Sequence, residues 1–443
     1  MIPRSFTNFV IIAAVSLAAP YRVWAEGRIT LEQAYDRTLS TDQTIRIAFL
    51  EVSKAKLLTW SALTRVAPTL TAGAGYTLFR TNAANFAGVV PDRTLVDRHG
   101  SATLDLTFTQ TLIDFSVFPA YRLGKLSARS AQLAKQFTIR ETLFGVTTAY
   151  YEVLKQQRLV DVNKVTLDLA QGQLDLSEKR YDVGEVTRSD VLRARVAVES
   201  ARRTWIESSN GLEADRNTLR NILNFAPDAP LEVVEPPAYP RDLPPFETLL
   251  RKAKQGREDL QVKEIAVKQD IERKNEVLGA YAPKVTAQAS GGHNNTEGST
   301  RARQNSWQVG VGIEVPFFTG GQREIDLVTA KYQIEQTQLD LDRAEKTVEA
   351  DVKQAWLDVR TLEGTLTAVK IEVTSAEQAY TDLQNRYAAG DATSVDVLSA
   401  LNDLDLARKE LAVQTYQYEV ALRNLEEVTG VFQQQRVSHA KIR

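Results

Sequence analysis

The fold is decided by the stretch RYDVGEVTRSDVLRARVAVESAR at 180–202, because the chain contains it twice. The second copy, RYAAGDATSVDVLSALNDLDLAR, stands at 386–408, which is 206 residues further on (386 against 180). Both copies share the pattern R-Y-x-x-G-x-x-T-x-x-D-V-L-x-A. A repeat with so long a period indicates two copies of one large structural unit.

Each copy predicts a tight turn between two helices. A glycine can adopt the positive φ that ends the arriving helix, and a threonine then serves as the N-cap of the next helix. An aspartate three residues later completes a capping box, and its charge suits the positive end of the new helix. These residues are Gly184, Thr187 and Asp190 in the first copy and Gly390, Thr393 and Asp396 in the second.

The first 25 residues predict a secretory signal. Arg4 precedes an apolar stretch at 9–19, and Ala25 ends a weak cleavage signal. After this segment no run of 18 apolar residues occurs, so no membrane-spanning helix is expected. The chain has no cysteine, which excludes disulfides, a lipid-modified cysteine and thiolate metal sites. Its net charge of −2 argues against a nucleic-acid partner.

Two pairs of β-strands are predicted by alternation of apolar and polar residues. Apolar residues such as Leu70, Tyr76 and Leu104 occupy every second position of these segments, and Thr, Gly and Ser fill most positions between them. We expect strands over 69–79, 101–114, 284–291 and 305–318, joined by polar loops over 80–100 and 292–304. Strands of roughly ten residues have the length of transmembrane β-strands.

Four strands cannot close a barrel by themselves. An open sheet edge in lipid would leave backbone N–H and C=O groups without hydrogen-bond partners. The strands must therefore pack as a sandwich or share a barrel with other copies of the chain. Three copies would supply 12 strands, an even number within the known range.

Two long helices are expected over 119–182 and 322–388, which contain no proline after residue 119. At 1.5 Å per residue each would extend for about 90 Å. Return helices are expected over 188–224 and 394–429, with tips at 183–187 and 389–393. A heptad stripe in the second return helix predicts coiled-coil packing. It comprises Val397, Leu401, Leu404, Leu411, Tyr418, Leu422 and Leu425.

The sequence thus divides into two structural repeats, at 26–225 and 247–430. A proline-rich crossover at 226–246 joins them, and we expect it to pack on the outside rather than to form a free linker. The polar segment at 431–443 is expected to be a disordered tail.

This order of elements resembles the TolC family of outer-membrane efflux channels, and the resemblance covers nearly all of the chain after the signal. It implies an α+β membrane protein that forms a homotrimer. Each protomer would give four strands to a shared 12-stranded transmembrane β-barrel and its helical hairpins to a periplasmic α-barrel. A periplasmic adaptor protein and an inner-membrane pump would dock at the tips. The channel would conduct substrate passively, without catalysis, cofactor or metal.

The resemblance also implies an aperture at the tips, formed by Asp396, Ser399 and Asp190. Asp396 aligns with an acidic residue of the family's aperture. Ser399 and Ala392 stand where the family has a second acid and an arginine, so the aperture pattern is only partly present. A ring of three Asp396 carboxylates would favour cations. Helix capping is the competing explanation for both aspartates.

Adaptor docking at the tips is a further implication of the resemblance, and the alternative is that the same residues only build the turns. The set comprises Arg180, Tyr181, Gly184, Thr187 and Leu192 in the first copy and Arg386, Tyr387, Gly390, Thr393 and Leu398 in the second.

On the strands, Asp105 and Glu314 are expected to face the lumen. Trp307, Tyr76 and Phe317 are expected to anchor the strands at the membrane interface.

Other function classes make different demands on the sequence. A periplasmic coiled-coil adaptor would need one hairpin flanked by β-domains, and a structural envelope protein without a channel would need no polar strand face. An enzyme is not expected, since the three histidines lack metalloprotease spacing and no phosphate-binding glycine loop occurs.

Overall fold

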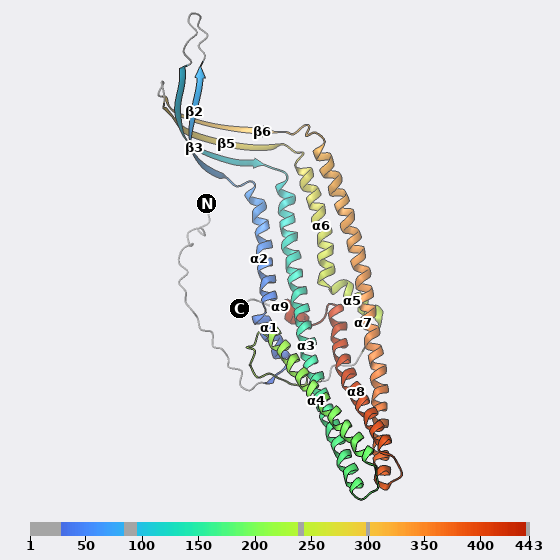
Figure 1. Ribbon diagram of the computed structural model, residues 1–443. Helices are drawn as coiled ribbons and strands as arrows, with labels where there is room; N and C mark the ends of the chain where they lie inside the picture. The colour runs from blue at the N-terminus through green and yellow to red at the C-terminus, as the bar shows by residue number, and fades with distance from the viewer. Residues whose placement is uncertain (1–27, 84–94, 238–242, 298–301, 440–443) are drawn as a thin grey trace, which may run out of the picture.

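The computed structural model describes residues 28–83, 95–237, 243–297 and 302–439. The expected signal segment at 1–25 lies outside these residues. The chain forms an elongated molecule with a β-sheet at one end and the tips of two helical hairpins at the other (Figure 1). Long helices connect the two ends.

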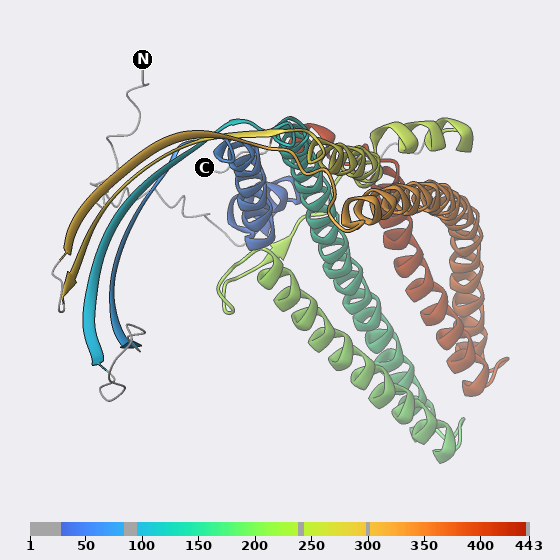
Figure 2. The same cartoon turned by 90° about the horizontal axis from the view of Figure 1, so that it is seen from above.

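The sheet is antiparallel and has the strand order β2-β3-β5-β6. Its strands are β2 (Thr69–Ala83), β3 (Leu95–Ile113), β5 (Lys284–Glu297) and β6 (Ala302–Glu314). The central pair, β3 and β5, joins strands from the two halves of the chain. The sheet curves strongly along its strands (Figure 2). Within the described residues, β2 and β6 each pair on one side only.

The bounds of all four strands differ from those expected from the sequence. β2 and β5 run further than expected and β3 and β6 begin earlier, so parts of both expected loops are strand. The backbone ladder continues through polar pairs such as His293 with Asn305, which an apolar alternation does not reveal. β6 ends at Glu314 instead of reaching 318. Pro316 follows, and proline cannot donate a ladder hydrogen bond.

Two long hairpins form the helical part. α3 (Val117–Asp182, 66 residues) is followed by α4 (Arg188–Ile222), and α7 (Gln322–Ala389, 68 residues) by α8 (Ser394–Val428). At 1.5 Å per residue, α3 and α7 are each about 100 Å long. α3 also packs along α8, which joins the two hairpins.

The heptad prediction for the second return helix is confirmed by burial in α8. Val397, Leu401, Leu404, Tyr418, Leu422 and Leu425 are all buried. Leu411 is partly buried and packs against the same cores.

Each repeat begins with two short helices of matching length. α1 (Leu31–Thr41) and α5 (Phe246–Gly256) have 11 residues, while α2 (Gln43–Thr64) and α6 (Glu258–Gly279) have 22. Asp42 separates α1 from α2, because its side chain accepts a hydrogen bond from the Ile45 amide and so starts a new helix. The duplication therefore extends over every major element.

The described part of the crossover, 226–237, contacts α3, and residues 238–242 lie outside the described ranges. β1 (Arg28–Ile29) and β4 (Glu232–Val233) form a two-residue parallel ladder. The Tyr150 hydroxyl donates to the Ile29 carbonyl at 2.9 Å and accepts from the Val234 amide at 2.9 Å. Tyr150 is buried, so this contact fixes the crossover to the core.

The expected disordered tail contains a helix, α9 (Gln434–His439). Phe432 and Val437 are each 1% exposed, and they anchor the segment in the core formed by α1, α3 and α4. Scattered apolar residues within a polar stretch were too weak a signal to predict this. Arg140, itself buried, donates to the Phe432 carbonyl and pairs with Glu258 of α6.

None of the helices in the described ranges combines the length and hydropathy needed to span a bilayer.

Candidate functional site

The hairpin tips are built by matching backbone geometry. Gly184 has φ 74° and Gly390 has φ 91°, both in the left-handed region that favours glycine. In the first tip, the Gly184 amide donates to the Tyr181 carbonyl at 2.9 Å. The Gly390 amide makes the equivalent bond to Tyr387 at 3.1 Å. The shared R-Y-x-x-G segment therefore encodes the same helix end twice.

Both return helices start with the capping box expected from sequence. In the second tip, Asp396 Oδ2 accepts from the Thr393 amide at 2.9 Å and from the Thr393 hydroxyl at 2.7 Å. In the first tip, Asp190 Oδ2 makes the same bonds to Thr187 at 3.0 and 2.7 Å. The threonine hydroxyl and amide hold the pKa of each carboxyl below its usual value. Capping is thus established as one role of both aspartates.

The structure brings only part of the expected aperture set together. Asp396 and Ser399 line a groove of about 500 Å³ between α7 and α8, together with Glu372 and Asp403. Asp190 lies on α4, in the other hairpin, and does not line this groove. The second hairpin therefore carries exposed acidic groups along one groove, with Asp396 at the tip and Glu372 further along α7.

The expected docking residues separate into exposed and buried ones. Tyr181 and Leu192 are exposed, and Leu398 is half-buried. Tyr387 is only 2% exposed and packs in the core shared by α3, α4, α7 and α8. Arg180 lies over the Tyr387 ring, with its guanidinium carbon 4.7 Å from the ring centroid. Tertiary packing thus covers Tyr387 and most of the Arg180 side chain in the single chain, so the docking prediction rests on the exposed residues of the set.

Asp105 and Glu314 lie on one face of the sheet. Asp105 is paired with Gly73 in β2 and Gly292 in β5, and Glu314 with Lys284 in β5. Because directly opposed residues point to the same side, both carboxylates share the polar face.

The opposite face is apolar and exposed in the single chain. Trp307 is 83% exposed, and Tyr76, Leu78, Val309 and Val311 are also exposed. Phe317 is exposed too, but it follows the end of β6 instead of lying within the strand.

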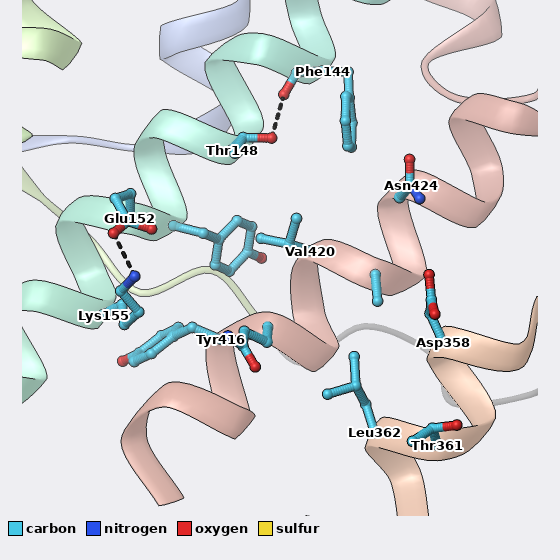
Figure 3. Close-up of a pocket in the computed structure, with 13 residues that line it drawn as sticks. Phe144, Thr148, Glu152, Lys155, Asp358, Thr361, Leu362, Tyr416, Val420 and Asn424 are labelled. Carbon is cyan, nitrogen blue, oxygen red and sulfur yellow. Dashed lines mark hydrogen bonds and ion pairs between the residues drawn. The ribbon is translucent and has the colours of Figure 1, made fainter. Parts of the chain in front are cut away.

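A groove that sequence reasoning missed lies between α3, α7 and α8, with a volume of about 590 Å³ (Figure 3). Tyr151 and Tyr416 line it, and burial raises the pKa of each hydroxyl to about 12. Glu152 and Lys155 pair with one another at its wall. No group of three metal-binding side chains occurs in the part of the chain that the structure describes.

Comparison with known proteins decides the family. The family model described as outer membrane efflux protein matches residues 34–224 and 249–431, which are most of the chain and fall on the two repeats. The chain belongs to this family. It is an outer-membrane exit channel of the efflux or type I secretion kind.

Individual proteins agree with this assignment. The outer membrane protein TolC of Vibrio cholerae is 24% identical over 94% of this chain and 93% of its own length. The alkaline protease secretion protein AprF of Pseudomonas aeruginosa is 25% identical over 74% of this chain and 69% of its own. The crystal structure of the outer membrane protein VceC from V. cholerae has a TM-score of 0.74 at 19% identity, covering 90% of this chain and 96% of that one.

Proposed function

We propose that three copies of this chain form one duct, with a 12-stranded β-barrel in the outer membrane and an α-barrel in the periplasm. The observation that carries this proposal is the open sheet. β2 and β6 are edge strands among the described residues, and the sheet presents a face of Leu, Val, Tyr and Trp side chains that suits lipid. Strand pairing between copies removes edges that lipid cannot satisfy.

The duct conducts its cargo passively. The polar face of the sheet, with Asp105 and Glu314, lines the barrel lumen, and the long hairpins continue the wall towards the tips. The energy for transport comes from an inner-membrane pump. The names of the relatives include a protease secretion protein, which supports a duct that serves either an efflux pump or a secretion system.

A periplasmic adaptor docks at the tips, where the turns present their exposed residues. The surface it contacts comprises Gly184, Thr187 and Leu192 of the first tip and Gly390, Thr393 and Leu398 of the second. Most of these residues are exposed in the single chain, and Leu398 is half-buried. Rigid capped turns suit this role, because a preorganised surface loses little conformational entropy on binding.

At the narrow end, three acidic grooves surround the opening, each with Asp396, Glu372 and Asp403 beside Ser399. Rings of carboxylates favour cations and repel anions in a pore. Asp396 caps α8 with one oxygen of its carboxylate and remains exposed. Asp396 can therefore cap α8 and at the same time contribute negative charge to the opening.

Planar-bilayer recording of the purified channel tests the proposal. We expect a cation-selective conductance, and Asp396→Asn should lower the cation preference while keeping a conducting channel. Asp190→Asn is the matched control, since Asp190 holds the same capping position in the first hairpin and does not line the groove that contains Asp396. Equal effects of the two variants would remove Asp396 from the aperture. No conductance from the unaltered protein would contradict the duct itself.

A further inference from the structure

The two copies of the Arg-Tyr pair have opposite surroundings, although both belong to the same R-Y-x-x-G motif. Tyr387 is 2% exposed, whereas Tyr181 is 45% exposed. The Arg180 side chain is 14% exposed, whereas that of Arg386 is 54% exposed. Thus the arginine of the first tip and the tyrosine of the second are covered, while their counterparts are open.

The covered pair forms a contact between the two hairpins of one chain. The Arg180 guanidinium stacks on the Tyr387 ring and donates a hydrogen bond to the Tyr387 carbonyl. Arg180 Nε also donates to Glu185 at 2.9 Å. The Tyr387 hydroxyl lies 3.2 Å from the Ser177 hydroxyl. The arginine of the first repeat thereby holds the tyrosine of the second.

Among the described residues, Arg386 and Tyr181 do not form the complementary contact. Arg386 is 4.0 Å from Asp382 and makes a long hydrogen bond, 3.5 Å, to the Asp391 carbonyl. A Cβ atom at Gly390 would lie 3.7 Å from Arg180, but one at Gly184 would meet nothing within 4 Å. The first tip therefore has an open site where the second tip has an arginine.

Packing between helices shows the same asymmetry. α3 packs along α8. The counterpart of α3 in the second repeat is α7, and the counterpart of α8 in the first repeat is α4. These two helices make no comparable contact in the described chain. Val165 of α3 and Ala412 of α8 line one cavity. With the repeat offset of 206 residues, Ile371 of α7 corresponds to Val165, and Ile206 of α4 corresponds to Ala412. Both isoleucines are exposed. The uncovered surface of α7 thus corresponds to the surface of α3 that contacts α8, and the uncovered surface of α4 corresponds to the surface of α8 that contacts α3.

We propose that Arg386 of one copy stacks on Tyr181 of the neighbouring copy, in a second copy of the contact that Arg180 makes with Tyr387. This inference rests on the proposed assembly of several copies around one duct. α7 then packs along α4 of the neighbour, with Ile371 against Ile206. Tyr181 and Arg386 lie between copies instead of on the surface open to an adaptor.

The two contacts alternate around the tips, one within each chain and one between chains. They differ at two positions. Asp391 stands where the first contact has Glu185, and Leu383 stands where it has Ser177. The tyrosine hydroxyl in the contact between chains therefore lacks a serine partner. The ring stacking and the arginine charge remain, since both need only the Arg-Tyr pair itself.

Thiol cross-linking tests this contact, and the absence of cysteine makes every introduced thiol unique. The variant with Tyr181→Cys and Arg386→Cys is assembled in membranes and treated with a short bismaleimide, which reaches further than a disulfide. We expect covalent dimers and trimers on denaturing gels. Coexpression of the two single variants should give covalent dimers, whereas either single variant alone should give none.

Arg180→Cys with Tyr387→Cys is the matched control, because the same residue types should then cross-link within one chain. Cross-linking of positions 181 and 386 within one chain would overturn the proposed contact. The proposed contact would also be overturned if positions 181 and 386 did not cross-link in a preparation that conducts ions and has the mass of a trimer. That result would leave the proposed duct unaffected. A protein that stays monomeric and does not conduct would contradict the proposed function as well.

Discussion

At the scale of single residues, the tips show how far local sequence determines structure. Both capping boxes could be predicted, because Thr187 and Thr393 interact with residues three positions away. The different burial of Tyr181 and Tyr387 could not, because the same local motif surrounds each. Burial there depends on which helix of the other repeat lies alongside.

The capping aspartates make the tips sensitive to acid. Hydrogen bonds from Thr393 lower the pKa of Asp396 in the folded tip, so the ionised carboxylate is the form that caps α8. A lowered pKa contributes stability that is present above the unfolded value, about 3.9, and is lost as pH falls through the folded value. We expect tip amides to keep constant hydrogen-exchange protection factors from pH 7 to 5 and to lose protection below about pH 4.

Asp396→Asn provides the control, since it should remove the acid-dependent change from the second tip and leave it at the first, where Asp190 remains. Loss of protection at both tips between pH 7 and 5 would show that another group controls them.

At the scale of elements, the helices were easier to predict than the ends of the strands. The absence of proline over more than 60 residues and the heptad stripe of α8 define long packed helices. Strand length depends on backbone pairing with a neighbour, and β5 continues through Gly291 and His293 with no apolar alternation. The helix α9 depends on Phe432 reaching a distant core, which no periodic pattern records.

Two glycines in α7 and its tip should respond to alanine in opposite ways. Gly390 has φ 91°, so Gly390→Ala should destabilise the hairpin by about 1 kcal/mol. Gly364 lies within α7, and an added Cβ would meet nothing within 4 Å. Gly364→Ala should therefore stabilise the helix by roughly 0.5–1 kcal/mol. Thermal unfolding followed by circular dichroism measures both; shifts of the same sign would contradict this account of the turn.

At the scale of the whole molecule, the duplication carries most of the information. From it, together with the apolar alternation and the prolines, the four strands, the two hairpins and the crossover could be predicted before any contact was known. The packing of β3 against β5 and of α3 against α8 could not be predicted. The sequence of one repeat does not indicate which of its surfaces contacts the other repeat. A periplasmic adaptor with one hairpin would lack this doubled architecture.

The same packing leaves three features of the single chain open. β2 and β6 leave edges on the described sheet, α4 and α7 leave uncovered apolar residues, and the polar strand face encloses nothing by itself. All three features are resolved together when copies are arranged around a common axis, a closed arrangement that most homo-oligomers adopt.

The protein mass of the purified channel in detergent, determined by light scattering with the detergent contribution subtracted, tests this account most directly. We predict a single species with three times the mass of one mature chain, unchanged on dilution. A stable, folded species with the mass of one chain would contradict the shared barrel, and with it the duct.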